Sequence, residues 1–150
     1  MSDNPLQELI DIVNTDGPLP VALPAWFNTA NRGLDPHLGI RYTAITREKV
    51  VAELPVAEHL LQPAGLVNGG VFSALAESVG SLAGVIAAGA PVVGVNNSTD
   101  FIAGVSQGVI EAVSTPVQTG RRTQLWEITM RNDGRLVART TLRTMVMDRQ

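Results

Sequence analysis

Residues 68–78 read NGGVFSALAES and open a long apolar stretch, in which Glu77 is the only charged residue between His59 and Asp100. A lone carboxylate among apolar residues costs free energy unless it is paired, exposed to water or used in chemistry. The pair Gly69-Gly70 ahead of it predicts a helix entry with free backbone N–H groups. Together these features indicate an acid/base or nucleophile and a preformed oxyanion site.

The apolar pattern predicts a helix over residues 69–88. Asn68 is a favoured N-cap, and Gly89-Ala90-Pro91 would end the helix. The apolar residues recur at steps of three or four and form one stripe: Val71, Leu75, Val79, Leu82 and Ile86. The residues that share the opposite face with Glu77 are small: Gly69, Ser73, Gly80, Ser81 and Gly84. Because small residues let a second backbone approach closely, we expect another subunit to cover this face. Glu77 would then lie in a narrow, partly desolvated interface, which favours its use as a base.

The rest of the chain predicts two short helices and six strands. The helices are expected at residues 5–15 and 25–32, and the strands at 39–46, 49–56, 92–96, 108–117, 123–131 and 136–146. Asn132-Asp133-Gly134 is a typical hairpin turn, and His37 is expected in a turn. No βαβ unit repeats, so we predict an α+β fold in which one antiparallel sheet wraps around a single long central helix. We expect one domain over residues 1–150, with residues 1–35 as an N-terminal helical extension.

Composition narrows the classes of function. The net charge of -3 and the pI near 5.3 argue against a nucleic-acid-binding protein, because no basic stripe is present to neutralise phosphates. The absence of cysteine excludes disulfides, thiolate-bound zinc and a Cys nucleophile. The two histidines lack metal-ligand spacing, so we expect no metal site.

Residues 69–90 are long enough to suggest a membrane span. Their five glycines, three serines and one glutamate favour a buried core helix instead, and we expect no membrane partner. The N-terminus lacks a basic region followed by an apolar one, so no signal peptide is evident. We expect a cytoplasmic location, with which the lack of cysteine is compatible.

Several of these residues have two open interpretations. Glu77 could be exposed, or paired with an arginine from the sheet. Asn68 could be a plain helix cap, and the two glycines after it could answer a steric need at the helix entry. Arg121 and Arg122, which precede Thr123 at a predicted strand start, could hold phosphates or could form a solvated strand end.

Several segments of the sequence resemble a known family. Residues 62–70 (QPAGLVNGG), followed by Leu75-Ala76-Glu77, resemble the hotdog-fold acyl-CoA thioesterases. More narrowly they are similar to the phenylacetate-pathway (PaaI-like) and 4-hydroxybenzoyl-CoA types, which carry a carboxylate on the central helix. Residues 93–101 (VGVNNSTDF) and 120–126 (GRRTQLW) resemble actinobacterial-type members. The resemblance spans about residues 38–146. It implies a homodimer whose sheets join edge to edge, active sites at the dimer interface, and a homotetramer built from two dimers.

The resemblance also implies roles for individual residues. Glu77 matches the catalytic carboxylate, and Gly69 matches the residue whose amide polarises the thioester carbonyl. Gln62 matches a side chain near that carbonyl or the attacking water, and Ser81 matches a hydroxyl that can hold water. The residues implied to lie near the coenzyme A phosphates are Arg121, Arg122 and Thr123. No metal or redox cofactor is implied, since coenzyme A is part of the substrate.

One position departs from the family pattern. Most relatives have His before the Gly-Gly pair, where this chain has Asn68. Asn can cap the helix and donate a hydrogen bond, but it cannot take up a proton at neutral pH.

The resemblance leads us to expect an acyl-CoA thioesterase for aryl or medium-chain acyl groups, with Glu77 as base or nucleophile. The alternative is a non-catalytic acyl-CoA-binding module. A hotdog hydratase ranks last, because no histidine is available at the helix.

Overall fold

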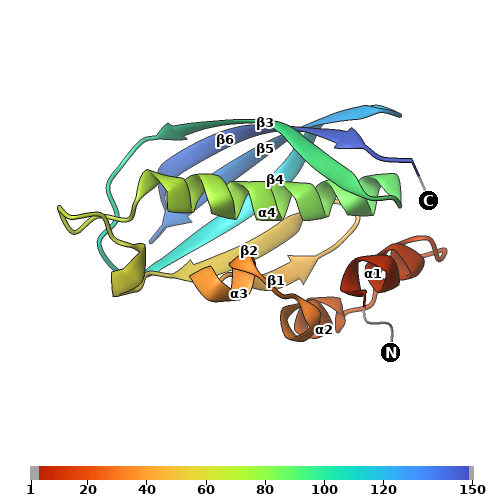
Figure 1. The fold of residues 1–150 in the computed structure, drawn as a ribbon, viewed down its shortest axis with the longest axis horizontal. Helices are drawn as coiled ribbons and strands as arrows, with labels where there is room; N and C mark the ends of the chain where they lie inside the picture. The colour runs from red at the N-terminus through yellow and green to blue at the C-terminus, as the bar shows by residue number, and fades with distance from the viewer. Residues whose placement is uncertain (1–3, 149–150) are drawn as a thin grey trace.

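The structure, a computed structural model that describes residues 4–148, consists of one sheet curved around one long helix (Figure 1). All strand pairs are antiparallel, and the strand order is β1-β2-β4-β5-β6-β3. The strands are β1 (Arg41–Ile45), β2 (Val50–Pro55), β3 (Val92–Phe101), β4 (Val109–Thr119), β5 (Thr123–Asn132) and β6 (Arg135–Val146). The predicted α+β architecture is confirmed. Strand β3 continues to Phe101, well beyond its predicted end at Asn96.

Helix α4 (Gly69–Ala88) has the predicted limits and forms the centre of the core. Every residue of its predicted apolar stripe is buried: Val71, Leu75, Val79, Leu82 and Ile86. Gly89 ends the helix in the left-handed region with φ of 58°. The helix has the length and hydropathy of a membrane span, but most of it is buried inside the fold, as in a core helix.

The small residues of α4 pack differently from our expectation. Gly80 and Gly84 face the sheet of their own chain, not a second subunit. A Cβ on Gly80 would lie 2.5 Å from Leu142 Cδ2, and a Cβ on Gly84 would lie 2.7 Å from Gln124 Oε1. These two glycines therefore let the helix approach β5 and β6 closely. The half-buried side of α4 carries Ser73, Ala74, Glu77, Ser78 and Ser81.

Among residues 4–148, three helices precede the sheet in the chain, and the first lies beside the C-terminal end of α4 (Figure 1). They are α1 (Pro5–Val13), α2 (Leu23–Ala30) and α3 (Leu34–Leu38), and a 3-10 turn, η1 (Glu58–Leu60), follows β2. The buried residues Leu9, Ile10 and Val13 join α1 to the core. Helix α3 was not predicted, because its short sequence contains Pro36. His37 lies in this helix and not in a turn.

Strand β3 is an edge of the sheet and contains a β-bulge. Gly94 pairs with Thr144 and Asn96 pairs with Arg143, so Val95 is an extra residue. In a regular strand, residues three apart point to opposite faces. The bulge instead brings Gly94 and Asn97 to the same face, toward α4. Because β3 is the last strand and pairs with β6 alone, its outer edge is open, and Val95 is 51% exposed.

Candidate functional site

Glu77 is half-buried on α4 and is held by strand β3. Its Oε2 accepts a hydrogen bond from Asn97 Nδ2 at 3.1 Å, and the same amide donates to the Ser73 carbonyl at 3.0 Å. Gly94 lies so close that a Cβ at this position would overlap Glu77 Oε1. Two salt bridges are found among residues 4–148, and neither involves Glu77, so the alternative of an arginine partner is not seen.

The Asn97 side chain is itself fixed by a chain of hydroxyl groups. Thr99 Oγ1 donates to Asn97 Oδ1 at 2.7 Å, and the hydroxyls of Thr99 and Thr140 lie 2.7 Å apart. Thr140 is fully buried in β6. Because the Asn97 oxygen is engaged by Thr99, the NH₂ group of Asn97 must point at Glu77. The carboxylate orientation is therefore set from the interior of the sheet.

Asn68 caps α4, as predicted. Its Oδ1 accepts a hydrogen bond from the Gly70 backbone N–H at 2.8 Å, and its carbonyl accepts from the Val71 N–H at 2.9 Å. The Gly70 amide is therefore occupied, which corrects the expectation that both glycine amides are available. The Gly69 N–H has no hydrogen-bond partner within residues 4–148, so it is the donor that remains for an oxyanion.

A cavity of about 300 Å³ adjoins the Gly69 amide end of the helix. Gln62 and Gly69 both line it, together with Phe72 and Phe101. The Phe101 ring lies directly over Gly69, where a Cβ would be only 2.8 Å from Phe101 Cζ, and it is 60% exposed. Gln62 Oε1 accepts from the Ala64 N–H at 2.7 Å, which anchors this side chain within its own loop. The structure therefore brings Gln62 and Gly69 to one site.

Glu77 and Gly69 of one chain do not meet. They are eight residues apart on α4, and a rise of 1.5 Å per residue separates them by roughly 12 Å along the axis. Ser81 lies one turn beyond Glu77 and lines a different cavity, between α4 and the N-terminal helices. One chain thus carries the carboxylate and the amide donor at two separate places.

Arg121, Arg122 and Thr123 lie at the opposite end of the sheet from Gly69. Arg121 and Arg122 are exposed in the turn between β4 and β5, and Thr123 pairs with Met145. By contrast, Phe101 beside Gly69 pairs with Ala138. Positions 138 and 145 of β6 are seven residue steps apart, which corresponds to roughly 23 Å, so these arginines cannot serve the Gly69 end of their own chain.

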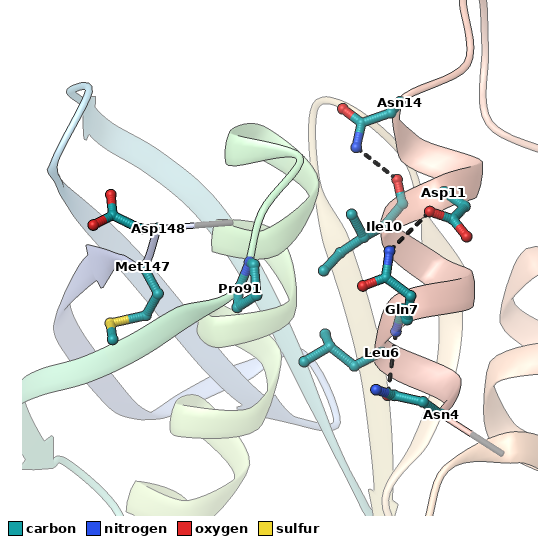
Figure 2. A pocket seen from close by; sticks show the side chains of 9 residues that line it. All are labelled: Asn4, Leu6, Gln7, Ile10, Asp11, Asn14, Pro91, Met147 and Asp148. Atoms are coloured by element: carbon teal, nitrogen blue, oxygen red, sulfur yellow. Dashed lines mark hydrogen bonds between the residues drawn. The ribbon is translucent and has the colours of Figure 1, made fainter. Parts of the chain in front are cut away.

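An open groove of about 470 Å³ lies beyond the C-terminal end of α4 (Figure 2). It separates α1 from Pro91, Met147 and Asp148. On the α1 side, Gln7 Nε2 donates to Asp11 Oδ1 at 2.9 Å, and Asn14 Nδ2 donates to the Ile10 carbonyl at 2.9 Å and to the Gly89 carbonyl at 3.0 Å. None of the predicted site residues lines this groove. Within residues 4–148, no group of three or more His, Asp or Glu side chains could hold a metal ion.

Asn97 and Gly94 were missed by sequence reasoning. Their contacts with Glu77 depend on the bulge at Val95, which changes the side-chain alternation and leaves no clear mark in the sequence. One signal was available: asparagine is depleted in strands, and Asn96-Asn97 follows directly on a run of strand-forming residues.

Known proteins share this arrangement of helix and sheet. Residues 64–138 match the Thioesterase superfamily. The chain is 40% identical over 114 residues to the proofreading thioesterase EntH of Cronobacter turicensis, an alignment that covers 74% of this chain and 83% of the relative. A solved thioesterase from Haemophilus influenzae superposes with a TM-score of 0.76 at 32% identity, over 84% of this chain and 88% of that one.

A variant of the phenylacetic acid degradation protein PaaI from Thermus thermophilus superposes with a TM-score of 0.71 at 25% identity, over 75% of this chain and 97% of that one. The hotdog fold that the resemblance implied is thereby confirmed. The chain belongs to the thioesterase superfamily.

Proposed function

We propose that this protein hydrolyses acyl-CoA thioesters to a free acid and coenzyme A. The observation that carries the proposal is that one helix, α4, carries both a fixed carboxylate and a free backbone N–H. Glu77 is a half-buried carboxylate whose orientation is fixed by Asn97, and Gly69 offers a backbone N–H at the positive end of the α4 dipole. A thioester carbonyl needs a donor of this kind, because its oxygen becomes negatively charged when the carbon is attacked.

The reaction can follow either of two routes from the same geometry. In one, Glu77 removes a proton from water, and the hydroxide adds to the carbonyl carbon. In the other, the Glu77 carboxylate adds to the carbon and water then hydrolyses the anhydride. In both, the C–S bond breaks, the thiolate of coenzyme A leaves and takes up a proton, and the acid is released. Gln62 supports the carbonyl end, and Ser81 holds water near the carboxylate. Neither route requires a metal or a redox cofactor.

The proposed site combines two copies of the chain. The separation of roughly 12 Å between Glu77 and Gly69 in one copy is too large for a single carbonyl group. A homodimer in which β3 edges pair would supply Gly69 from one copy and Glu77 from the other. The exposed edge strand, with Val93 and Val95 half-exposed, supports this arrangement. We further propose that two dimers form a homotetramer.

The coenzyme A end of the substrate is assigned to Arg121, Arg122 and Thr123. Their exposed position in a turn suits contact with phosphates, which arginine binds through paired N–H groups. Since they lie far from Gly69 in their own chain, this role also requires a neighbouring copy. A cytoplasmic location completes the proposal.

Position 69 allows a sharp test of the oxyanion donor. Gly69 is the first residue of α4, where proline is well tolerated, and Asn68 before it is already extended with ψ of 136°. Gly69→Pro therefore removes the N–H without breaking the helix. We expect kcat in a thiol-release assay to fall by a factor of about 10²–10³. Gly69→Ala is the matched control: it meets the same Phe101 ring but keeps the N–H, and it should retain most activity.

A mixing experiment tests the two-copy site. Glu77→Gln alone should lower kcat by about 10²–10⁴, because an amide cannot act as base or nucleophile. When inactive Glu77→Gln and Gly69→Pro chains are refolded together, each mixed dimer should regain one intact site. Recovery of up to about a quarter of wild-type activity follows from random pairing of the two chains. No recovery from chains that demonstrably co-assemble would refute the shared site.

The alternative of an acyl-CoA-binding module without turnover is favoured by one observation. Asn68 replaces the usual histidine and uses its side chain to cap Gly70, so it supplies no proton. The thiolate of coenzyme A is a fairly good leaving group, which is why we favour hydrolysis. Tight binding of a panel of aryl and aliphatic acyl-CoA thioesters, with no thiol release from any of them, would establish the alternative.

A further inference from the structure

A cavity of about 390 Å³ lies at the N-terminal end of α4, beside α3 and η1. Asn68 and Gly70 line it, whereas Gly69 between them lines the cavity that also contains Gln62. The two cavities share no lining residue among residues 4–148, so the Gly69 amide lies at their boundary. When a thioester carbonyl is bound at this amide, its sulfur can therefore lie in the cavity beside Asn68 and Gly70.

The wall of this cavity offers a single group for proton transfer. Most of the wall is apolar and consists of Leu34, Leu38, Leu60, Leu61, Val71 and Ala74. Among residues 4–148, His59 is the only titratable side chain that lines it. Histidine takes up and releases a proton near neutral pH, which the amide of Asn68 cannot do. A thiolate beside an apolar wall is less well solvated than in water, and this increases the benefit of a proton donor.

The backbone of His59 is fixed relative to the start of α4, while its side chain can adjust. The next residue, Leu60, accepts a hydrogen bond from the Asn68 backbone N–H at 2.9 Å. The His59 side chain is exposed, and its Nε2 lies 3.4 Å from the His37 carbonyl oxygen. This distance is long for a hydrogen bond, so little free energy opposes a turn of the ring within the cavity.

We propose that His59 donates the proton that the leaving sulfur takes up, a role that Asn68 leaves open. The proposal rests on the proposed thioesterase function. As the C–S bond breaks, its electron pair goes to the sulfur, and the protonated His59 ring transfers one N–H proton to it. Coenzyme A leaves as the thiol, and the neutral imidazole regains a proton from solvent water. His59 lies outside residues 64–138, so the family match does not assign this role.

Two thioesters with different leaving thiols test this role in the whole protein. S-phenylacetyl-N-acetylcysteamine releases an alkyl thiol, as phenylacetyl-CoA does, and S-phenyl phenylacetothioate releases the more acidic thiophenol. For His59→Gln we expect kcat/KM of the alkyl thioester to fall about a hundredfold, near the lower limit for general acid catalysis. The fall for the aryl thioester should be less than about threefold, because thiophenolate leaves without a proton. His37→Gln is the matched control: its ring lies 6.4 Å from that of His59 but does not line the cavity, so it should change neither value.

A second variant separates proton donation from damage to the fold. Asn68→His returns an imidazole to the same cavity wall. Combined with His59→Gln, it should raise kcat/KM for phenylacetyl-CoA at least about tenfold above that of His59→Gln alone. An equal loss in His59→Gln for both leaving thiols overturns the role of His59, as does full activity of this variant. Absence of thiol release by the wild type from all these thioesters overturns the proposed function, and the role of His59 with it.

Discussion

At the scale of single residues, the position of the Glu77 carboxylate depends on side chains that are distant in sequence. Asn97 donates to it, Gly94 leaves space for it, and the hydroxyls of Thr99 and Thr140 fix the Asn97 amide. A reacting group displaced by about 1 Å can lose roughly a hundredfold in rate. The neighbours of Glu77 should therefore matter for turnover even where they touch no substrate.

Replacement of Asn97 tests this dependence. Asn97→Ala removes the hydrogen bond to Glu77, and we expect kcat to fall about tenfold to a hundredfold with little change in KM. Asn97→Asp should be worse, because it faces Glu77 with a second negative charge. Asn96→Ala is the control on the same strand, since Asn96 is exposed. Similar kinetics for all three variants would show that Asn97 does not position the carboxylate.

Tyr42 makes a separate prediction about pH. Burial, and then the neighbouring Asp35 charge, raise its pKa in the folded protein, so the folded state holds this proton more tightly than the unfolded chain, whose value is about 10. The stabilising contribution is complete below pH 10 and is lost as pH rises toward the folded pKa, by up to about 1.4 kcal/mol per pH unit. Tyr42 is the sole tyrosine, so tyrosinate absorbance follows it directly. Urea unfolding above pH 10 should show a steeper decline for wild type than for Tyr42→Phe.

At the scale of elements, the sequence predicts the course of the chain better than it predicts contacts. The apolar periodicity of α4 depends on local burial, and the helix that it predicts is confirmed. The strand predicted over residues 136–146 is confirmed as well. The sequence could not predict that Gly80 and Gly84 face the sheet of their own chain, because small residues allow close approach by any backbone. Helix α3 was missed because its few residues include Pro36, which usually marks a turn. Asp35 was therefore not recognised as part of the wall of the cavity that Ser81 lines.

The close packing of α4 on the sheet can be tested at Gly80. A Cβ there would lie 2.5 Å from Leu142 Cδ2 and 3.1 Å from Ile128 Cδ1, and both side chains are fully buried. Overpacking of this kind costs about 1–3 kcal/mol, which exceeds the gain of at most about 1 kcal/mol from better helix propensity. Gly80→Ala should lower the free energy of unfolding in urea. Ala87→Leu, at an exposed position of the same helix, should change it by less than about 0.5 kcal/mol.

At the scale of the whole molecule, the site is spread over the two ends of the fold. Gly69, beside Phe101, lies at one end of the sheet, and Arg121 lies at the other. A sequence motif can identify such residues but cannot show that one chain keeps them apart. Assembly of copies is therefore a condition for the proposed reaction and not only a source of stability.

The open edge of β3 provides the test of assembly. Lysine on an exposed edge strand opposes pairing, because it must be desolvated and meets its own copy across a twofold axis. Val93→Lys combined with Val95→Lys should shift the protein to monomers in light scattering, with loss of thiol release. Val21→Lys, at a fully exposed valine outside the sheet, should leave both unchanged. A double variant that is monomeric yet fully active would contradict the shared site.

The bulge in β3 also determines how this strand tolerates the loss of a codon. Since Val95 has no partner of its own in the ladder, an in-frame deletion of Val95 leaves Gly94 and Asn97 two positions apart and still facing α4. A deletion of Ser98, only three codons later, moves the side chains of all strand residues on one side of it to the opposite face of the sheet. Hydroxyl and amide groups then point to the wrong face. For the face that β3 turns toward α4, one codon is thus dispensable and its near neighbour is not, although neither encodes a residue that touches the carboxylate.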